Sequence, residues 1–302
     1  MQDINLNNIT IDKLSLPVFT AQNIEVSVLR LDKVHPFISG NKWFKLRFYL
    51  EEAKELHKKK IVTFGGAWSN HIIATAAACQ LNGLAATGII RGEESAQLSP
   101  TLKLAKEMGM QLIFISREEY RRKKILEEII HDDHYFISEG GYGIKGAAGA
   151  ATILDCVKKE NYSHICCAAG TGTMLAGIVM ASGEQNKILA ISVLKNNFEI
   201  EKQVQSLLPG NKMNFDFIHD YHFGGYAKYA RHPVDKPDLI HFMNEFYRLT
   251  SIPSDFVYTG KLFYAIHDLI ASDYFPSGSR LLLIHSGGLQ GNASINKGTL
   301  IF

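Results

Sequence analysis

Short apolar runs alternate with longer segments of helical period along the first half of the chain. Three apolar runs have the length of buried strands: residues 61–64, 85–90 and 111–115. Three segments with helical spacing follow them: residues 70–82, 100–108 and 118–131. Strands that alternate with helices through short turns predict a parallel sheet with helices on both of its faces.

A glycine-rich stretch over residues 138–149 interrupts this alternation, which then resumes. The second series of helices and strands lies at residues 146–160, 164–169, 174–182, 188–194 and 280–285. We therefore predict an α/β protein of two lobes, each an open, twisted, mainly parallel sheet with helices on both faces. The small lobe would span residues 45–148, and the large lobe residues 1–44 and 149–302. The active site is expected between the lobes, beyond the carboxyl ends of the strands.

The composition is that of an ordinary globular protein, and it narrows the classes of partner. The 302 residues are 46% hydrophobic and carry a net charge of +2, from 32 basic and 30 acidic side chains. This balance gives no electrostatic reason to expect nucleic acid or an acidic membrane surface as a partner. No apolar stretch approaches the roughly 20 residues of a membrane helix, and the first residues do not have the pattern of a secretory signal.

The four cysteines favour a reducing, cytoplasmic location. Cys166 and Cys167 are adjacent in an apolar run, and no pair of cysteines has CxxC spacing. The pattern therefore suggests neither a disulfide framework nor a metal site.

Glycine-rich loops follow the strands that end at residues 64, 169 and 285. The loop Gly170-Thr171-Gly172-Thr173 opens a helix, where backbone amides and the helix N-terminus favour a phosphate. A tight turn between strand and helix would explain the same residues equally well. The missing Gly-Lys-Ser/Thr ending argues against a nucleotide-hydrolase loop. A dinucleotide site is disfavoured too, because the third glycine is displaced to Gly177.

Two further segments place polar side chains at the start of a helix. Ser69 can cap the helix that follows it, or it can bind a carboxylate together with Asn70 and His71. Lys42 lies just before a long amphipathic helix, where a lysine is usually solvated. Taken singly, none of these residues indicates a reaction.

The ordered set of motifs resembles the family of 1-aminocyclopropane-1-carboxylate deaminases and D-cysteine desulfhydrases. Five motifs occur in the family's order: Gly40-Asn41-Lys42 with Lys45, Ser69-Asn70-His71, Gly170-Thr171-Gly172-Thr173, Tyr258-Thr259-Gly260-Lys261 and His285-Ser286-Gly287-Gly288. The resemblance extends from about residue 29 to residue 291. It implies the tryptophan-synthase-β-like fold (fold type II of the pyridoxal-phosphate enzymes), pyridoxal 5'-phosphate as the cofactor, and a small amino acid as the substrate.

The resemblance implies how the cofactor is held. Lys42 would form the Schiff base with it and, once freed by the substrate amine, would move protons. Lys45 and the loop of residues 170–173 would bind its phosphate, and Asn70 would lie by the ring hydroxyl. Thr259 would face the ring nitrogen and leave it largely neutral, whereas deaminases that open cyclopropane rings have a carboxylate there.

The same resemblance implies the contacts of the substrate. Ser69, Asn70 and His71 would bind the substrate carboxylate, and Ser69 could also act on the substrate directly. Tyr258 matches a family tyrosine near the substrate, and Tyr226 matches a second one. Ser69, Tyr226 and Tyr258 would complete the catalytic set that begins with the cofactor-linked lysine.

Two positions favour a desulfhydrase within the family, and three others depart from its pattern. Thr259 stands where the deaminases have a carboxylate, and Ser286, a predicted substrate contact, stands where they have a leucine. Trp68, Ile72 and Ile73 differ from the usual desulfhydrase residues around the substrate loop. These differences leave the exact substrate open.

We therefore expect a lyase that eliminates sulfide from D-cysteine and releases pyruvate and ammonia. Ring opening of 1-aminocyclopropane-1-carboxylate is the alternative reaction. A pyridoxal-phosphate-binding protein with little turnover is the alternative class, and the intact Lys42, Ser69, Tyr226 and Tyr258 argue against it. We expect a cytoplasmic homodimer without a metal and without nucleic-acid or membrane partners.

Overall fold

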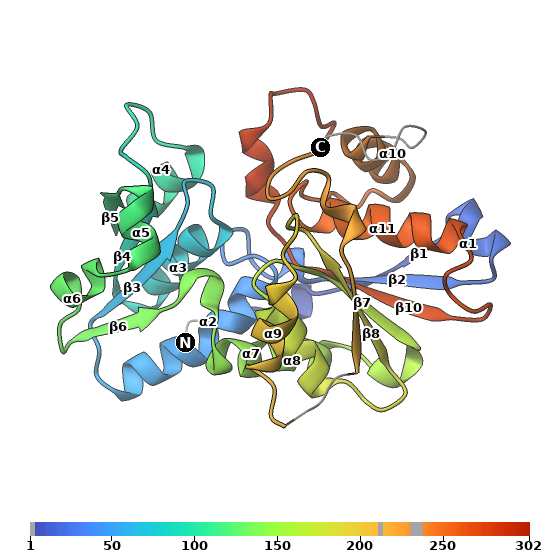
Figure 1. Ribbon diagram of the computed structural model, residues 1–302, viewed down its shortest axis with the longest axis horizontal. Coiled ribbons are helices and arrows are strands. Elements are labelled where there is room, and N and C mark those ends of the chain that lie inside the picture. The colour runs from blue at the N-terminus through green and yellow to red at the C-terminus, as the bar shows by residue number, and fades with distance from the viewer. Residues whose placement is uncertain (1–3, 211–213, 230–237) are drawn as a thin grey trace.

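Two mainly parallel sheets form the two lobes of the molecule (Figure 1). The computed structural model describes residues 4–210, 214–229 and 238–302. Six strands build the sheet of the large lobe, in the order β1 (Ile11–Leu14), β2 (Glu25–Arg30), β10 (Arg280–His285), β7 (His164–Ala169), β8 (Lys187–Ser192) and β9 (Phe215–Ile218). β1 pairs with β2 in antiparallel orientation, and the other described pairs are parallel. The predicted fold class is confirmed.

Both faces of the large sheet are covered by helices. Alternate residues of a strand point to opposite faces, so Leu281 and Leu283 of β10 pack on one side, and Leu282 and Ile284 on the other. The first side holds α1 (Pro17–Ala21), α10 (Leu239–Thr250) and α11 (Thr259–Ala271). The second side holds α2 (Asn41–Glu55), α7 (Ile144–Ala151), α8 (Thr173–Ala181) and α9 (Glu199–Gln205).

The small lobe repeats this plan with four parallel strands. Their order is β5 (Met110–Ile115), β4 (Ala85–Arg91), β3 (Lys60–Gly65) and β6 (His134–Ile137). Four helices cover the sheet: α3 (Asn70–Asn82), α4 (Pro100–Glu107), α5 (Arg117–Arg122) and α6 (Ile125–Ile129). Val62 and Phe64 of β3 pack with Tyr120 of α5, whereas Ile61 packs on the side of α3. Thr63 lies on the same face of the sheet as Ile61, so its side chain faces α3.

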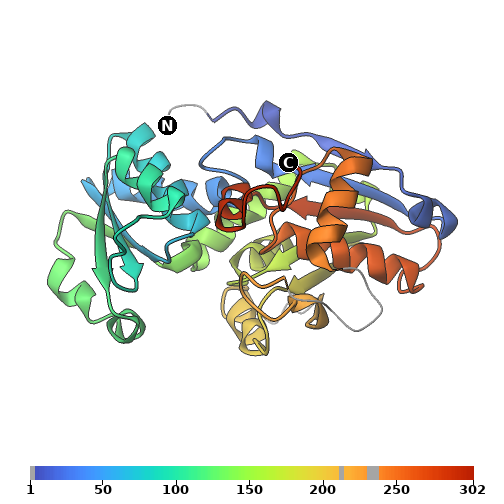
Figure 2. The ribbon, with the colours of Figure 1, turned by 90° about the horizontal axis from the view of Figure 1, so that it is seen from above.

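A continuous core and one helix connect the lobes. The same hydrophobic cluster contains Ile61 of the small sheet and Ile165 of the large one. α2 begins at Asn41 and continues to Glu55, so the expected boundary between residues 44 and 45 falls inside this helix. Figure 2 shows the two lobes from above, with the C-terminal segment near their junction. The division into two domains stays a prediction.

Two predicted helices are shorter in the structure than expected. Residues 118–131 form α5 and α6 in place of one helix, because Lys123 takes a left-handed φ of 54° and its amide closes α5 on the carbonyl of Glu119. The helix predicted over residues 146–160 ends at Ala151. There the Thr152 hydroxyl donates to the carbonyl of Gly149 over 2.7 Å, and a 3-10 turn replaces the α-helix.

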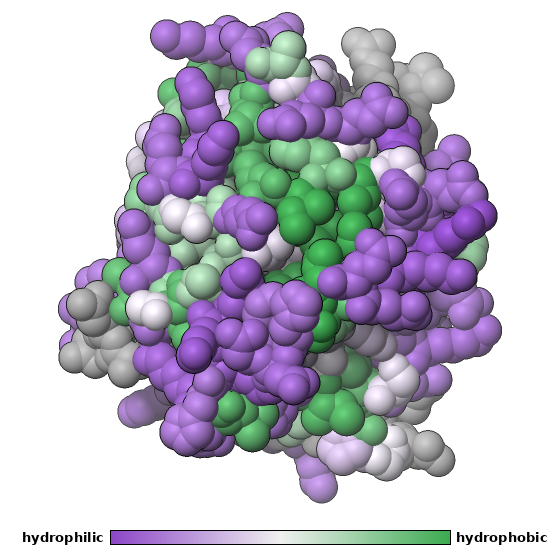
Figure 3. All heavy atoms as spheres, turned by 90° about the vertical axis from the view of Figure 1, so that its left-hand side faces the viewer, coloured by the Kyte–Doolittle hydropathy of each residue, from purple (hydrophilic) through white to green (hydrophobic). Residues whose placement is uncertain are grey.

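The helix lengths, the clustering of polar side chains and the surface concern possible membrane, metal and protein contacts. None of the helices in the described ranges has the length and apolarity to cross a bilayer. Within the same ranges, no three His, Cys, Asp or Glu side chains cluster as a metal site would require. Figure 3 shows the small-lobe end of the molecule, where hydrophilic residues border a band of apolar ones. The homodimer and the cytoplasmic location stay predictions.

Candidate active site

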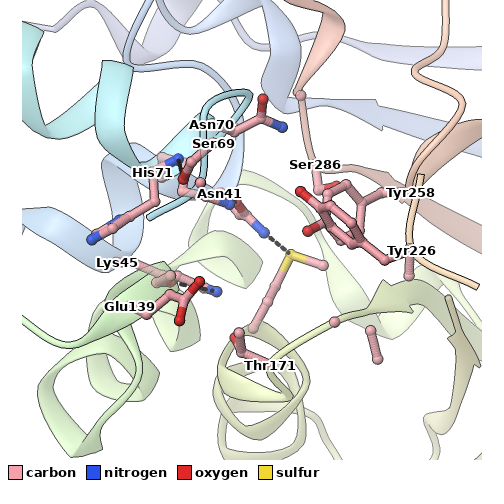
Figure 4. A pocket seen from close by; sticks show the side chains of 18 of the residues that line it. Asn41, Lys45, Ser69, Asn70, His71, Glu139, Thr171, Tyr226, Tyr258 and Ser286 are labelled. Carbon is pink, nitrogen blue, oxygen red and sulfur yellow. Dashed lines mark hydrogen bonds between the residues drawn. The ribbon is translucent and has the colours of Figure 1, made fainter. Parts of the chain in front are cut away.

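A pocket of about 400 Å³ lies between the lobes, at the carboxyl ends of strands from both sheets. Eleven of the residues predicted for the site line it: Lys42, Lys45, Ser69, Asn70, His71, Gly170, Thr171, Gly172, Tyr226, Tyr258 and Ser286. Figure 4 shows side chains from both lobes converging on it. Thr173 and Thr259 do not line the pocket, and both are fully buried next to residues that do.

A close backbone approach brings the start of α2 beside the loop after β10. The amide of Asn41 donates to the carbonyl of Ser286 over 3.1 Å. Gly40 has a φ of 62°, and a Cβ on it would lie 1.9 Å from the same carbonyl oxygen. Glycine alone tolerates both the left-handed φ and this contact, so the Gly-Asn-Lys motif determines where the helix starts.

Lys42 enters the pocket from the first turn of α2. Its Nζ donates to Asn41 Oδ1 over 2.7 Å, and Asn41 Nδ2 contacts Met174 Sδ at 3.3 Å (Figure 4). Burial lowers the pKa of Lys42 to about 8, and the charge of Asp255 opposes this shift. An amine with such a pKa is partly neutral, and therefore nucleophilic, near neutral pH.

Lys45 lies one turn further along α2 and is nearly buried, at 4% exposure. Its Nζ donates to the carbonyl of Gly140 over 3.3 Å. Burial and the neighbouring charge of Lys42 hold the pKa of Lys45 well below its usual range. A bound anion would favour the charged form again, which is the behaviour expected of a phosphate ligand.

The loop between β7 and α8 has the geometry of an anion cradle. Gly172 precedes α8 with a φ of 75°, and a Cβ on it would lie 2.5 Å from Val204 Cγ2. The hydroxyl oxygens of Thr171 and Thr173 lie 3.1 Å apart. No described side chain caps the amides at the start of α8, so they can bind an anion.

Ser69 caps α3 and still keeps its proton for a ligand. Its Oγ accepts from the amides of His71 and Ile72 at 3.2 and 3.3 Å, which leaves the hydroxyl hydrogen free to donate to a carboxylate. The next residue, Asn70, has its Oδ1 occupied by Gln290 Nε2 at 2.6 Å. The Nδ2 group of Asn70 is therefore the end that can donate to a ligand.

Thr63 holds the ring of His71 in one tautomer. The Thr63 hydroxyl donates to the carbonyl of Ile137 over 2.7 Å, so its oxygen accepts from His71 Nε2 at 2.9 Å. Nδ1 therefore carries a lone pair, and it is buried without a hydrogen-bond partner among the described residues. Burial and the two nearby lysine charges lower the pKa of His71 to about 3, so the ring is neutral. In this state Nδ1 can accept a hydrogen bond but cannot donate one to a carboxylate.

Two tyrosines form the large-lobe side of the pocket. The ring of Tyr258 lies against Gly170, where a Cβ would be 2.9 Å from Tyr258 Cε1. The ring centroids of Tyr226 and Tyr258 are 6.4 Å apart, at an interplanar angle of 72° (Figure 4). Burial raises the pKa of both hydroxyls, and it raises that of Tyr258 well above its usual value. Both hydroxyls therefore keep their protons at neutral pH and can donate them.

Thr259 is bound to a buried carboxylate that the sequence did not indicate. Its Oγ1 donates to Asp255 Oδ1 and accepts from the Asp255 amide, both over 2.8 Å. The Asp255 carboxylate also accepts from the amides of Val257, Tyr258 and Thr259 at 2.9, 2.8 and 3.0 Å. The Thr259 hydroxyl proton is thus committed, and only a lone pair remains for a ligand. Its contact with a ring nitrogen stays a prediction.

Some residues that line the pocket belong to none of the sequence motifs, and some residues that depart from the family's pattern do not line it. Arg91 ends β4 and Glu139 follows β6, and both line the pocket. Their positions at strand ends were the available signal. Among the three departures from the desulfhydrase pattern, Trp68 lines the pocket, whereas Ile72 and Ile73 are 0% and 1% exposed in the core. The two isoleucines therefore do not alter the substrate surface.

The pocket presents the groups that pyridoxal phosphate requires. Lys42 offers an amine of lowered pKa for the aldehyde. The glycine loop before α8 offers uncapped amides for the phosphate, and its close packing leaves no room for a side chain at Gly172. Asn70 offers an amide donor for the ring hydroxyl. The three groups line one cavity, so they fit the cofactor.

Comparison with known proteins agrees with this fit. The profile of the family described as "Pyridoxal-phosphate dependent enzyme" matches residues 13–287. A putative 1-aminocyclopropane-1-carboxylate deaminase from Pyrococcus abyssi is 29% identical over 89% of this chain and 86% of its own. A bifunctional D-cysteine desulfhydrase/1-aminocyclopropane-1-carboxylate deaminase, mitochondrial, from Arabidopsis thaliana is 28% identical over 88% of this chain and 73% of its own.

A solved structure extends the agreement to three dimensions. It is described as an ACC deaminase homologue and superposes with a TM-score of 0.80, at 26% identity, over 94% of this chain and 90% of its own. The resemblance predicted from the motifs and the predicted cofactor are both confirmed. The chain therefore belongs to the family of pyridoxal-phosphate-dependent enzymes, as a lyase or deaminase related to 1-aminocyclopropane-1-carboxylate deaminase and D-cysteine desulfhydrase.

Proposed function

We propose that this enzyme eliminates sulfide from D-cysteine and releases pyruvate and ammonia. The observation that carries the proposal is a pocket that combines a base of lowered pKa, Lys42, with two protonated tyrosine hydroxyls, Tyr226 and Tyr258. Elimination removes a proton from Cα and expels a thiolate from Cβ, so it needs a base and a proton donor in one pocket. Pyridoxal phosphate, when bound, supplies the electron sink for this reaction.

Three residues would hold and orient the substrate carboxylate. Ser69 donates its free hydroxyl hydrogen, and the Nδ2 group of Asn70 lies at the same helix start. Ser286, on the opposite lobe, lines the same pocket and adds a hydroxyl. The positive end of α3 favours the negative charge there. The contribution of His71 would be different, because its Nδ1 carries a lone pair without a partner among the described residues and can accept a hydrogen bond but not donate one.

The proton transfers are divided between Lys42 and the two tyrosines. The Lys42 amine, in the first turn of α2, would take the Cα proton once the substrate amine has displaced it. Tyr226 or Tyr258 would give a proton to the departing sulfur, since both hydroxyls are protonated at neutral pH and their pKa values are raised further. The Thr259 hydroxyl donates its proton to Asp255, so only its lone pair would face the ring nitrogen of the cofactor. That lone pair would accept a hydrogen bond if the ring nitrogen were protonated.

A coupled product assay tests the proposed reaction. The purified enzyme, saturated with pyridoxal phosphate, is mixed with D-cysteine while pyruvate and sulfide are measured in the same sample. We expect the two products to appear in equal amounts, and Lys42→Ala to abolish both. Turnover of L-cysteine at an equal or higher rate would contradict the assigned stereochemistry, and the absence of both products would contradict the reaction.

Ring opening of 1-aminocyclopropane-1-carboxylate is the second candidate. It is favoured by the names of the Pyrococcus abyssi and Arabidopsis relatives. It is also favoured by Asp255, which places a carboxylate one hydrogen bond behind Thr259, the position where the ring-opening enzymes are expected to have an acid. Formation of 2-oxobutanoate from 1-aminocyclopropane-1-carboxylate faster than pyruvate from D-cysteine would make this the main activity.

A further inference from the structure

The first turn of α11 buries a lysine that the proposed reaction does not use. Lys261 is 0% exposed and follows Tyr258 by three residues. Its Nζ donates to three backbone carbonyls, those of Gly225 at 2.8 Å, His222 at 2.9 Å and Val193 at 3.3 Å. An ammonium group has three N–H donors, so these three acceptors satisfy it completely.

The carbonyls belong to segments that shape the pocket. Leu194 directly follows Val193, and Tyr226 directly follows Gly225. These two residues and Tyr258, which precedes α11, all line the pocket. Gly224 and Gly225, with φ values of 95° and 120°, contribute no side chain that could hold the loop before Tyr226. One ammonium group therefore joins the segments that form the large-lobe wall.

The arrangement suits a cation better than a neutral amine. Three carbonyl oxygens converge on one nitrogen, and a neutral amine would turn its lone pair towards one of them. Carbonyl oxygens directed at a common point are also how proteins replace the water around a bare cation. Burial lowers the pKa of Lys261 to about 8, and the charge of Asp255 opposes this shift.

We propose that the Lys261 ammonium is a built-in cation that positions Tyr226 and Leu194 against Tyr258. Lys261 does not line the pocket, so it acts on the reaction through these neighbours, as a positioning residue. The proposal concerns the shape of the pocket wall, and it stands whichever amino acid proves to be the substrate.

Chemical rescue of Lys261→Ala tests the proposal. The substitution removes the ammonium and leaves the three carbonyl oxygens around a space that methylammonium can enter. We expect kcat to fall roughly 100-fold, as for a pocket residue misplaced by about 1 Å. Saturating methylammonium chloride should restore kcat by about tenfold or more and raise the melting temperature of the variant. Tetramethylammonium chloride at the same ionic strength is too bulky for the space and should do neither.

Lys261→Met is the matched control, because it fills the same space without a charge. We expect its kcat to fall similarly and methylammonium to leave both its kcat and its melting temperature unchanged. Equal rescue of the Met variant, or an Ala variant with neither rescue nor a melting shift, would overturn the proposal. The melting shift is read on the cofactor-loaded protein, so it remains decisive even if D-cysteine is not the substrate.

A second substitution covers the case in which Lys261→Ala does not fold. Lys261→Gln keeps two N–H donors without a charge, so it can bind two of the three carbonyls. We expect its kcat to lie between those of the wild type and Lys261→Met. A kcat no higher than that of Lys261→Met would contradict a role for these hydrogen bonds.

Discussion

Burial, more than ion pairing, sets the protonation states of the side chains in the pocket. It lowers the pKa of Lys42 and His71 and raises that of Tyr258. At neutral pH the pocket therefore holds a partly neutral Lys42 amine that can accept a proton and a neutral His71 ring that can accept a hydrogen bond, beside tyrosine hydroxyls that can donate. This pairing of shifted groups in one cleft is typical of acid–base catalysis.

The rate at which Lys42 links to the cofactor should follow a pKa of about 8. The reaction with an aldehyde requires the neutral amine, and burial lowers the pKa of Lys42 from 10.5 to about 8. Linkage should therefore accelerate as pH rises to about 8 and level off above it. Rapid-mixing absorbance of the cofactor-free enzyme with pyridoxal phosphate measures this. A rate that keeps rising towards the ordinary lysine value of 10.5 would contradict the burial argument.

Thr63 should determine the tautomer of His71. Thr63→Val removes the acceptor of Nε2–H and leaves this buried donor unsatisfied, at a cost of roughly 1–3 kcal/mol in the free energy of unfolding. Nitrogen-15 NMR of the wild type should show protonated Nε2 and unprotonated Nδ1 throughout the neutral range. Thr63→Ser, which keeps the hydroxyl, should retain this signature, and Thr63→Val should lose it. Protonated Nδ1 in the wild type would contradict the assignment.

At the scale of elements, the site is assembled from the first turns of helices. α2 brings in Lys42, α3 begins directly after Ser69, α8 follows the loop of residues 170–172, and α11 begins after Tyr258. α3 and α8 each follow a strand, α2 follows Gly40 with its left-handed φ, and the start of α11 is capped by the Asp255 carboxylate. The amides at the start of α8 have no described side-chain cap and are available to an anionic group. The element boundaries therefore position side chains that line the pocket.

Gly172→Ala should weaken cofactor binding more than it weakens the fold. The left-handed φ of 75° costs an alanine roughly 1–2 kcal/mol, and its Cβ would lie 2.5 Å from Val204 Cγ2, so the loop or the Val204 side chain must move. Gly109→Ala is the matched control, since its φ is 84° and nothing lies within 4 Å of the added Cβ. Urea unfolding should show a lower free energy of unfolding in both variants than in the wild type. Titration with pyridoxal phosphate should show weaker binding only for Gly172→Ala; equal binding would contradict the phosphate role of this loop.

Several elements could be predicted from sequence with accurate bounds because local signals agreed there. Residues 70–82 begin after a capping serine and end before Gly83, and the structure places α3 over the same residues. The strand over residues 164–169 is an apolar run before a glycine loop, and it matches β7. Residues 118–131 lack such a stop signal, because the residue that ends α5 in a left-handed conformation is a lysine. Asparagine or glycine at position 123 would have indicated the break.

At the scale of the whole molecule, the two sheets turn their carboxyl ends towards one pocket. The order of the motifs predicts a common site for Lys42, Ser69 and Tyr258, and all three line this pocket. The sequence does not indicate roles for Lys261 and Thr63, because these depend on hydrogen bonds to backbone carbonyls distant in sequence. Such partners leave no periodic or local pattern in the sequence.

The measurement that tests the central claim most directly is chemical trapping of the cofactor on its lysine. The enzyme loaded with pyridoxal phosphate is reduced with borohydride, digested, and searched by mass spectrometry for the pyridoxyl-modified peptide. We expect the modification on Lys42, and we expect Lys42→Ala to show none. Modification of Lys45 or Lys261 in its place, or of no residue in the wild type, would contradict the account of this pocket.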